Sequence, residues 1–194
     1  MEKQLGLNDI RAAHERIQRY IHKTPILTCS SLDEIFGIQL YFKCENFQKV
    51  GAFKFRGACN ALLSLNKRDA EKGVVTHSSG NHAAALALAA QRRGIRAYIV
   101  MPSNAPKVKI AAVKNYDGII TFCEPTLESR ETTAERIIEE TGATMIHPFN
   151  NYNIIAGQGT AALELLTEID DLDFIMTPVG GRGLLSGTAL PAKA

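Results

Sequence analysis

The chain has 194 residues, 45% of them hydrophobic and 22% charged, which is usual for a globular protein of one large or two small domains. A net charge of +2, with Lys and Arg mixed among Asp and Glu, argues against a nucleic-acid partner. No apolar run approaches the roughly 20 residues of a membrane span, and none follows the N-terminus as in a signal peptide. The four cysteines have neither zinc-site nor Cys-x-x-Cys spacing, so we expect free thiols in a cytoplasmic protein without a metal site.

Apolar residues between Leu7 and Ile21 recur at helical spacing, up to a break at Lys23-Thr24-Pro25. A short helix capped by Ser30 or Ser31 and ending at Gly37 comes next. The remaining predicted elements, in chain order, are strand 38–44, helix 54–66, strand 73–77, helix 82–93, strand 96–101, helix 106–115, strand 118–123, helix 126–141, strand 143–146, helix 157–168, strand 173–179 and a helical segment after Gly183.

This alternation of strands and helices with short loops predicts an α/β protein with a largely parallel sheet. Ligands of such sheets bind beyond the carboxyl ends of the strands. Four groups of polar or glycine residues follow predicted strands: Lys54, then Ser79 and Asn81, then His147 and Asn150, and finally Gly180–Gly183. We therefore expect these groups to converge.

Lys54 lies in the motif Gly51-Ala52-Phe53-Lys54-Phe55-Arg56-Gly57. The small residues leave room for a ligand, and the two phenylalanines are placed to desolvate the amine. Desolvation lowers the pKa of a lysine and frees the neutral amine for reaction with a carbonyl group. The alternative is an ordinary solvated surface lysine.

Two turns are candidate anion sites. Ser78-Ser79-Gly80-Asn81-His82 is either a helix cap or a loop that holds a carboxylate. Gly180-Gly181-Arg182-Gly183 is either a simple turn or a nest of backbone N–H groups for a phosphate. It is not a dinucleotide fingerprint, because Ser186 stands where the third glycine belongs. The segment His147-Pro148-Phe149-Asn150 is a third strand exit, with no role assigned by its residues alone.

Taken together and in order, these motifs resemble those of the fold-type II enzymes that depend on pyridoxal 5'-phosphate (PLP), within the threonine/serine dehydratase and serine racemase group. The resemblance runs from Thr24-Pro25 to the last residue and is to the N-terminal portion of these enzymes. The matching segments are 42–49, the Lys54 motif, Ser79-Gly80-Asn81-His82, His147-Pro148-Phe149, Ala156-Gly157-Gln158-Gly159-Thr160 and Gly180–Gly187.

The resemblance implies an open parallel-sheet substrate domain at 66–150. It places 1–65 and 151–194 in a second α/β domain, the large PLP-binding domain, which this sequence leaves incomplete. Lys54 would bind PLP covalently and remove the α-proton of the substrate. The other implied cofactor residues are Phe53 beside the ring, Asn81 on the ring oxygen, and Gly180, Gly181, Arg182, Gly183 and Leu184 around the phosphate. The implied substrate-carboxylate residues are Ser78, Ser79, Asn81 and His82.

The activity implied first is a dehydratase (ammonia-lyase) that converts L-threonine or L-serine to a 2-oxo acid and ammonia. The first alternative is a serine racemase, in which Ser79 would return a proton to the opposite face of the α-carbon. The second alternative is an inactive remnant or a partner-binding subunit. An incomplete parallel sheet has an exposed apolar edge, so we also expect self-association into a homo-oligomer.

Arg182 departs from the family pattern, in which this loop normally has four glycines. If the position requires a positive φ, a side chain there costs roughly 1–3 kcal/mol of strain. We therefore expect Arg182 to weaken PLP binding; the alternative is that its side chain reaches the phosphate directly.

Overall fold

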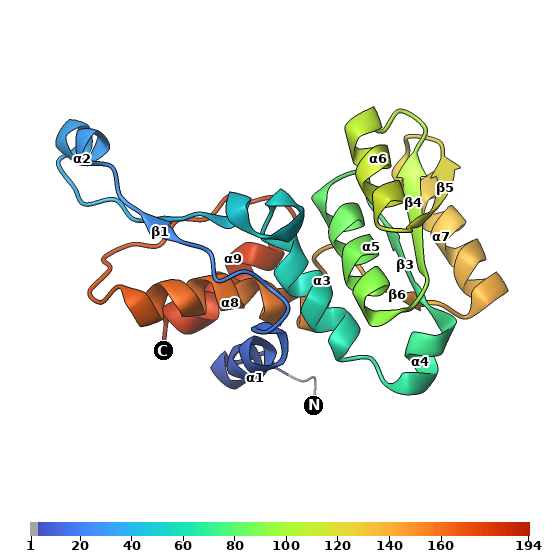
Figure 1. The fold of residues 1–194 in the computed structure, drawn as a ribbon, viewed down its shortest axis with the longest axis horizontal. Helices are drawn as coiled ribbons and strands as arrows, with labels where there is room; N and C mark the ends of the chain where they lie inside the picture. Colours follow the sequence, from blue (N-terminus) through green and yellow to red (C-terminus); the bar gives the residue numbers. More distant parts are fainter. Residues whose placement is uncertain (1–3) are drawn as a thin grey trace.

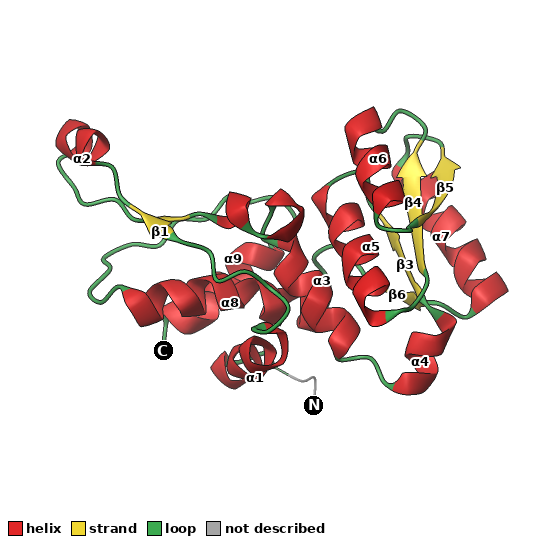
Figure 2. Cartoon of the chain, in the orientation of Figure 1, coloured by secondary structure: helices red, strands yellow, loops and turns green. Residues whose placement is uncertain are grey.

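The computed structural model describes residues 4–194, which form two groups of elements with α3 between them (Figures 1 and 2). The helices are α1 (Leu7–Ile17), α2 (Ser30–Phe36), α3 (Lys54–Leu63), α4 (Lys67–Lys72), α5 (Asn81–Arg93), α6 (Lys107–Asn115), α7 (Leu127–Thr141), α8 (Tyr152–Glu168) and α9 (Gly183–Ala192), with two 3-10 turns, η1 (Glu45–Phe47) and η2 (Lys49–Gly51). The strands are β1 (Ile26–Leu27), β2 (Phe42–Lys43), β3 (Val74–His77), β4 (Ala97–Pro102), β5 (Ile119–Cys123) and β6 (Thr144–Met145).

A four-stranded parallel sheet in the order β5-β4-β3-β6 confirms the predicted α/β class. Successive side chains of a strand point to opposite faces of the sheet. Val74 and Ile99 therefore join the apolar core under α5, whereas Val75 and Val100 join a second core under α7. Since β3 and β6 are neighbours, their carboxyl ends place the segments after His77 and after Met145 side by side.

The other group is built around α1, α8 and α9, carries the β1–β2 pair and α2, and is joined to the sheet through α3 (Figure 1). Helix α8 approaches its neighbours closely at glycines. A Cβ at Gly157 would lie 2.6 Å from Gly57 Cα of α3, and one at Gly159 would lie 2.6 Å from the Gly187 carbonyl of α9. These contacts fix α3, and Lys54 at its first residue, against α8.

The predicted domain boundary at residues 65 and 66 crosses a continuous core. Phe55 and Leu62 of α3 are buried together with Leu86 and Ile99 of the sheet region. The four cysteines are free thiols, as predicted. None of the described helices is long and apolar enough to cross a bilayer, and residues 4–194 contain no group of three or more metal-ligating side chains.

Two predicted strands are wrong. Of residues 38–44, only Phe42 and Lys43 form a strand, and it pairs antiparallel with Ile26–Leu27, which the sequence did not predict as a strand. Residues 173–179 form no strand, and Phe174 and Met176 are 88% and 86% exposed. An apolar pattern predicts an extended segment, but a strand also needs a neighbour for its backbone N–H and C=O groups. Within residues 4–194, the segment 173–179 has no such neighbour.

Two helix predictions also change. Helix α8 begins at Tyr152 instead of residue 157, because Asn151 caps it by accepting the Asn153 and Ile154 N–H groups. Helix 54–66 ends at Leu63, and the short helix α4, capped by Asn66, follows it.

Candidate active site

Lys54 begins α3 with its side chain half-buried. Its Nζ donates a hydrogen bond to the Pro148 carbonyl at 3.0 Å and lies 5.3 Å from the centre of the Phe53 ring. Burial lowers the pKa of Lys54, because the ammonium loses hydration. The amine is thereby closer to the neutral, nucleophilic form than a surface lysine is.

The turn after β6 connects Lys54 with the glycine loop at 180–183. Pro148 accepts the Lys54 hydrogen bond, and the next residue, Phe149, lies against the loop. A Cβ added at Gly181 would overlap the Phe149 ring, and one at Gly183 would lie 3.2 Å from Phe149 Cβ. The structure therefore brings together Lys54, the 147–150 turn and the glycine loop. It does so although 173–179 forms no strand and only Phe42 and Lys43 of 38–44 do.

The glycine loop ends at the N-terminus of α9, where Arg182 occupies the cap position without a side-chain cap. The first N–H groups of a helix have no partner inside the helix, and together with the helix dipole they attract anions. A glycine-lined turn at such an end fits a phosphate group, and the half-buried amine of Lys54 fits an aldehyde. The residues present thus fit both the aldehyde and the phosphate group of PLP.

Arg182 adopts a left-handed conformation, with φ of 66°. This is the geometry in which a side chain is strained and glycine is not. Replacing Arg182 with glycine is expected to raise the free energy of unfolding by about 1 kcal/mol and to tighten PLP binding. Urea denaturation and PLP titration measure the two effects. Gly181→Ala is the matched control and should change both in the opposite direction, because its Cβ overlaps the Phe149 ring. Equal or lower stability of the Arg182 variant would contradict the strain argument.

The segment 78–82 lies at the carboxyl end of β3, as predicted, with Ser79 half-buried in the turn before α5. Ser78 Oγ accepts the Gly80 N–H at 3.3 Å. Asn81 is exposed, and its Oδ1 accepts a 2.6 Å hydrogen bond from Lys109 Nζ, so contact with a cofactor ring oxygen would have to replace this bond.

His82, the last residue of the predicted substrate-carboxylate loop, has a buried side chain. Its side chain is 2% exposed, and its Nε2 donates to the Ile146 carbonyl at 3.3 Å. Burial, with Lys54 as the largest charge effect, lowers the pKa of His82 to about 3. The imidazole is neutral at pH 7 and ties α5 to the end of β6, so any substrate contact by His82 would come from its backbone.

Arg56, two residues after Lys54, is the structural feature that sequence reasoning missed. It is fully buried and donates to both oxygens of Glu45 at 2.8 Å and to the two oxygens of Glu164 at 2.7 and 2.8 Å. Lys43 Nζ also binds Glu164 at 2.8 Å. Although burial alone would lower the pKa of Arg56, its hydrogen bonds with Glu164 and Glu45 hold it above the usual value. The signal in the sequence was an isolated acid, Glu164, inside the apolar part of α8.

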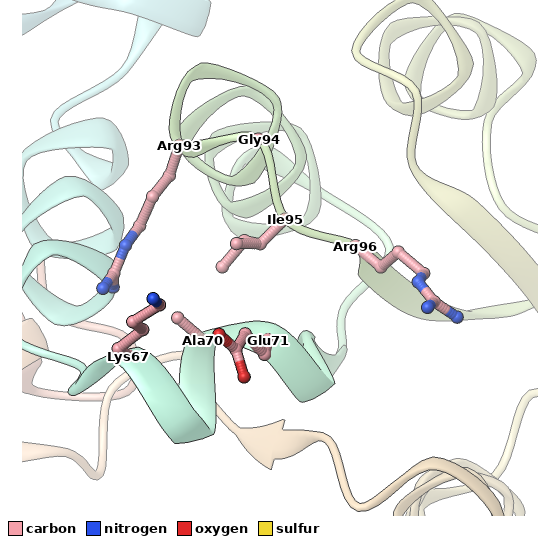
Figure 3. Close-up of a pocket in the computed structure, with 7 residues that line it drawn as sticks. All are labelled: Lys67, Ala70, Glu71, Arg93, Gly94, Ile95 and Arg96. Carbon is pink, nitrogen blue, oxygen red and sulfur yellow. The ribbon is translucent and has the colours of Figure 1, made fainter.

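Two cavities help to delimit the site. One of about 500 Å³ lies between α4 and the end of α5 and contains none of the predicted site residues (Figure 3). Arg93 and Lys67 extend toward one another there, while Arg96 points away. The other, of about 340 Å³, is lined by Phe53 and Leu184 together with Ile175 and Met176. Two predicted cofactor residues thus border this second cavity.

Comparisons with known proteins cover most of this chain. A family model described as "Pyridoxal-phosphate dependent enzyme" matches residues 17–194. A serine racemase of rice (Oryza sativa subsp. indica) is 58% identical over 97% of this chain and 56% of its own length. A beta-hydroxyaspartate dehydratase of Paracoccus denitrificans is 53% identical over 94% of this chain and 58% of its own length. The solved structure of maize serine racemase superposes with a TM-score of 0.97 at 51% identity, covering 98% of this chain and 58% of that one.

The chain therefore spans less than two thirds of the length of these relatives. The names of the relatives support the serine racemase alternative better than the dehydratase interpretation. The match over residues 17–194 and the shared fold agree with the fit of Lys54 and the glycine loop to the cofactor. On this basis, the chain belongs to the family of pyridoxal-phosphate dependent enzymes.

Proposed function

We propose that this chain carries the catalytic lysine and the cofactor cradle of a serine racemase-like enzyme. The observation that carries the proposal is the placement of Lys54: its half-buried amine is joined through Pro148 and Phe149 to the glycine loop. The dehydratase interpretation is the second candidate, favoured by the 53% identity to a beta-hydroxyaspartate dehydratase. The substrate common to both candidates is a small hydroxy amino acid, L-serine or L-threonine.

In this proposal Lys54 holds PLP, Phe53 flanks it, the backbone of Gly180–Leu184 binds its phosphate, and Asn81 reaches its ring oxygen. When bound, PLP draws electrons from the α-carbon of an amino acid and makes the proton on that carbon removable. Because burial lowers its pKa, Lys54 Nζ is more often in the neutral form at neutral pH than a surface lysine is, and this neutral amine accepts the proton. The turn from Ser78 to His82 supplies hydroxyl and N–H groups for the substrate carboxylate at the N-terminus of α5.

The two activities differ in what happens after the α-proton has left. Racemisation requires a second proton donor on the opposite side of the α-carbon, and Ser79 Oγ fills this role in the proposal. Dehydration requires loss of the β-hydroxyl group. Water then hydrolyses the resulting unsaturated amine to the 2-oxo acid and ammonia. Both outcomes begin with the same proton transfer to Lys54, so one variant can separate them.

Replacing Ser79 with alanine is expected to lower racemisation by roughly 10²–10⁴-fold, because the second proton donor is removed. Dehydration, which needs only Lys54 as the base, should fall much less. To measure both activities, the chain is incubated with PLP and L-serine, and D-serine and pyruvate are quantified in the same samples. Ser78→Ala is the comparison variant: Ser78 belongs to the same proposed carboxylate-binding turn but is not the proposed second proton donor, so its loss should lower D-serine and pyruvate formation to a similar extent.

Equal losses of D-serine and pyruvate in the Ser79 variant would contradict the assignment of Ser79 as a proton donor. Pyruvate without D-serine in the parent chain would favour the dehydratase candidate. Neither product, with PLP bound, would favour a chain that needs a partner or has lost activity. The assay thus distinguishes all three hypotheses raised by the sequence.

A further inference from the structure

His147 is the first residue of the turn, 147–150, that connects Lys54 with the glycine loop of the proposed cofactor site. It follows β6, and its ring meets the ring of His77, at the end of β3, in a T-shaped contact with centroids 5.6 Å apart. The ring of Phe149 lies 4.5 Å from it on another side, also edge-on. His147 is therefore packed between the carboxyl end of the sheet and the residue that borders the glycine loop.

The hydrogen bonds of His147 determine which ring nitrogen carries the proton. Its Nδ1 accepts the Asn150 N–H at 3.0 Å and also the Phe149 N–H, at the longer distance of 3.4 Å. An imidazole nitrogen that accepts hydrogen bonds from backbone amides has no proton of its own, so the neutral ring carries its proton on Nε2. The turn from 147 to 150 is thus closed by an acceptor that exists only in the neutral histidine.

This turn places two groups of the site at once. The Pro148 carbonyl accepts the hydrogen bond from Lys54 Nζ at 3.0 Å. The Phe149 ring occupies the space over Gly181 that a side chain would need. If the turn opens, Lys54 loses its acceptor and the glycine loop loses the wall behind it.

We infer that His147 is a positioning residue whose neutral imidazole closes the 147–150 turn and so fixes both Lys54 and the glycine loop. Protonation of Nδ1 turns the acceptor into a donor, and the bonds from Phe149 and Asn150 are lost together. The cofactor site then loosens in acid. The connection to the cofactor rests on the proposed function of Lys54, whereas the state of the turn is measurable without it.

Charged and titratable groups around His147 decide where this transition lies. The titratable neighbours of His147 are His77 on β3 and His82 on α5. The charged neighbours are Lys54 on α3 and Glu131 on α7. Arg130, also on α7, acts on His77. Burial is the main effect that lowers the pKa of His147; His77 and Lys54 act in the same direction and Glu131 opposes them. The turn is therefore closed above the ordinary histidine pKa of about 6.5 and opens as the pH falls below it.

Nuclear magnetic resonance of the PLP-free chain tests the inference directly. Side-chain ¹⁵N shifts report which nitrogen of His147 is protonated, and hydrogen exchange reports protection of the Phe149 and Asn150 amides. We expect an Nε2-protonated ring at pH 7.5 (about one unit above the ordinary histidine pKa). Amide protection should fall by about tenfold as His147 becomes protonated.

Two substitutions separate a positioning role from general stability. His147→Asn keeps an acceptor at the position of Nδ1 but cannot titrate, so amide protection should persist in acid. His147→Leu keeps an apolar side chain of similar bulk but no acceptor, so protection should be lost at every pH while the helices stay folded by circular dichroism. His77→Asn is the matched control: it should shift the midpoint of the transition and leave the transition itself in place.

An Nδ1-protonated His147 at pH 7.5 would overturn the inference, as would unchanged protection in the leucine variant. An acid transition that survives in His147→Asn would assign it to another group, and the inference would fail. A pH titration of PLP binding in the same variants then tests the connection to the cofactor. If Lys54 proves not to bind PLP, the amide and tautomer measurements still decide the role of His147.

Discussion

Replacing Lys54 with alanine is expected to abolish specific PLP binding and to lower turnover of L-serine by roughly 10³-fold or more. The half-buried amine is both the group proposed to hold the cofactor and the base proposed to take the α-proton. Its loss removes both functions at once. The visible absorbance of the chain with added PLP measures binding, and D-serine and pyruvate formation measure turnover.

Lys49 provides the control for this prediction. Burial is the main effect that lowers the pKa of Lys49, as it is for Lys54, and Lys49 Nζ lies 5.6 Å from the centre of the Phe55 ring. Lys49 Nζ donates to the Tyr20 carbonyl, however, and not toward the glycine loop. Lys49→Arg should retain the absorbance band. Loss of the band in the Lys49 variant, with retention in the Lys54 variant, would move the cofactor lysine to position 49.

Replacing Arg56 with methionine is expected to lower the free energy of unfolding by about 3–5 kcal/mol. The substitution leaves Glu45 and Glu164 facing each other across a buried space, with only Lys43 to compensate for two carboxylates. Taking one partner out of a buried ion pair leaves an uncompensated charge, which costs more than the pair itself contributes. Urea denaturation followed by circular dichroism gives the change.

Lys23→Met is the matched control for Arg56. Lys23 Nζ binds Glu168 at 3.2 Å, but this pair is exposed, with side chains 70% and 35% accessible. Exposed ion pairs contribute about 0–1 kcal/mol, so the control should stay near the parent. A loss below about 1 kcal/mol in Arg56→Met would mean that the buried network does not hold α3 against α8.

The sequence predicted the central sheet well because its strands are self-evident from local pattern. Segments such as Val74–His77 and Ala97–Pro102 are short apolar runs bounded by turns, and α5 and α7 end at the left-handed glycines Gly94 and Gly142. Residues 38–44 and 173–179 have the same apolar character but no adequate partner strand in the described chain. Pattern alone does not reveal whether a neighbouring strand is present, so these two predictions failed.

Local motifs likewise predicted some parts of the candidate site and not others. Lys54, the glycine loop and the turn after β6 were predicted from local motifs, and the structure brings them together. The strain at Arg182 was also expected from a glycine pattern, and its φ of 66° agrees. The Arg56 network was not predictable in this way, because its partners are 11 and 108 residues away along the chain. Glu164, an isolated acid in the apolar part of α8, marks a buried charge but does not identify its partner.

The most direct test of the central claim identifies the residue that carries the cofactor. The chain is incubated with PLP, reduced with borohydride to make the attachment permanent, digested and mapped by mass spectrometry. Modification confined to the peptide containing Lys54, and absent from the Lys54→Ala variant, is the result that this account predicts. Modification of another lysine, or none at saturating PLP, would contradict the assignment of Lys54 as the cofactor-binding residue.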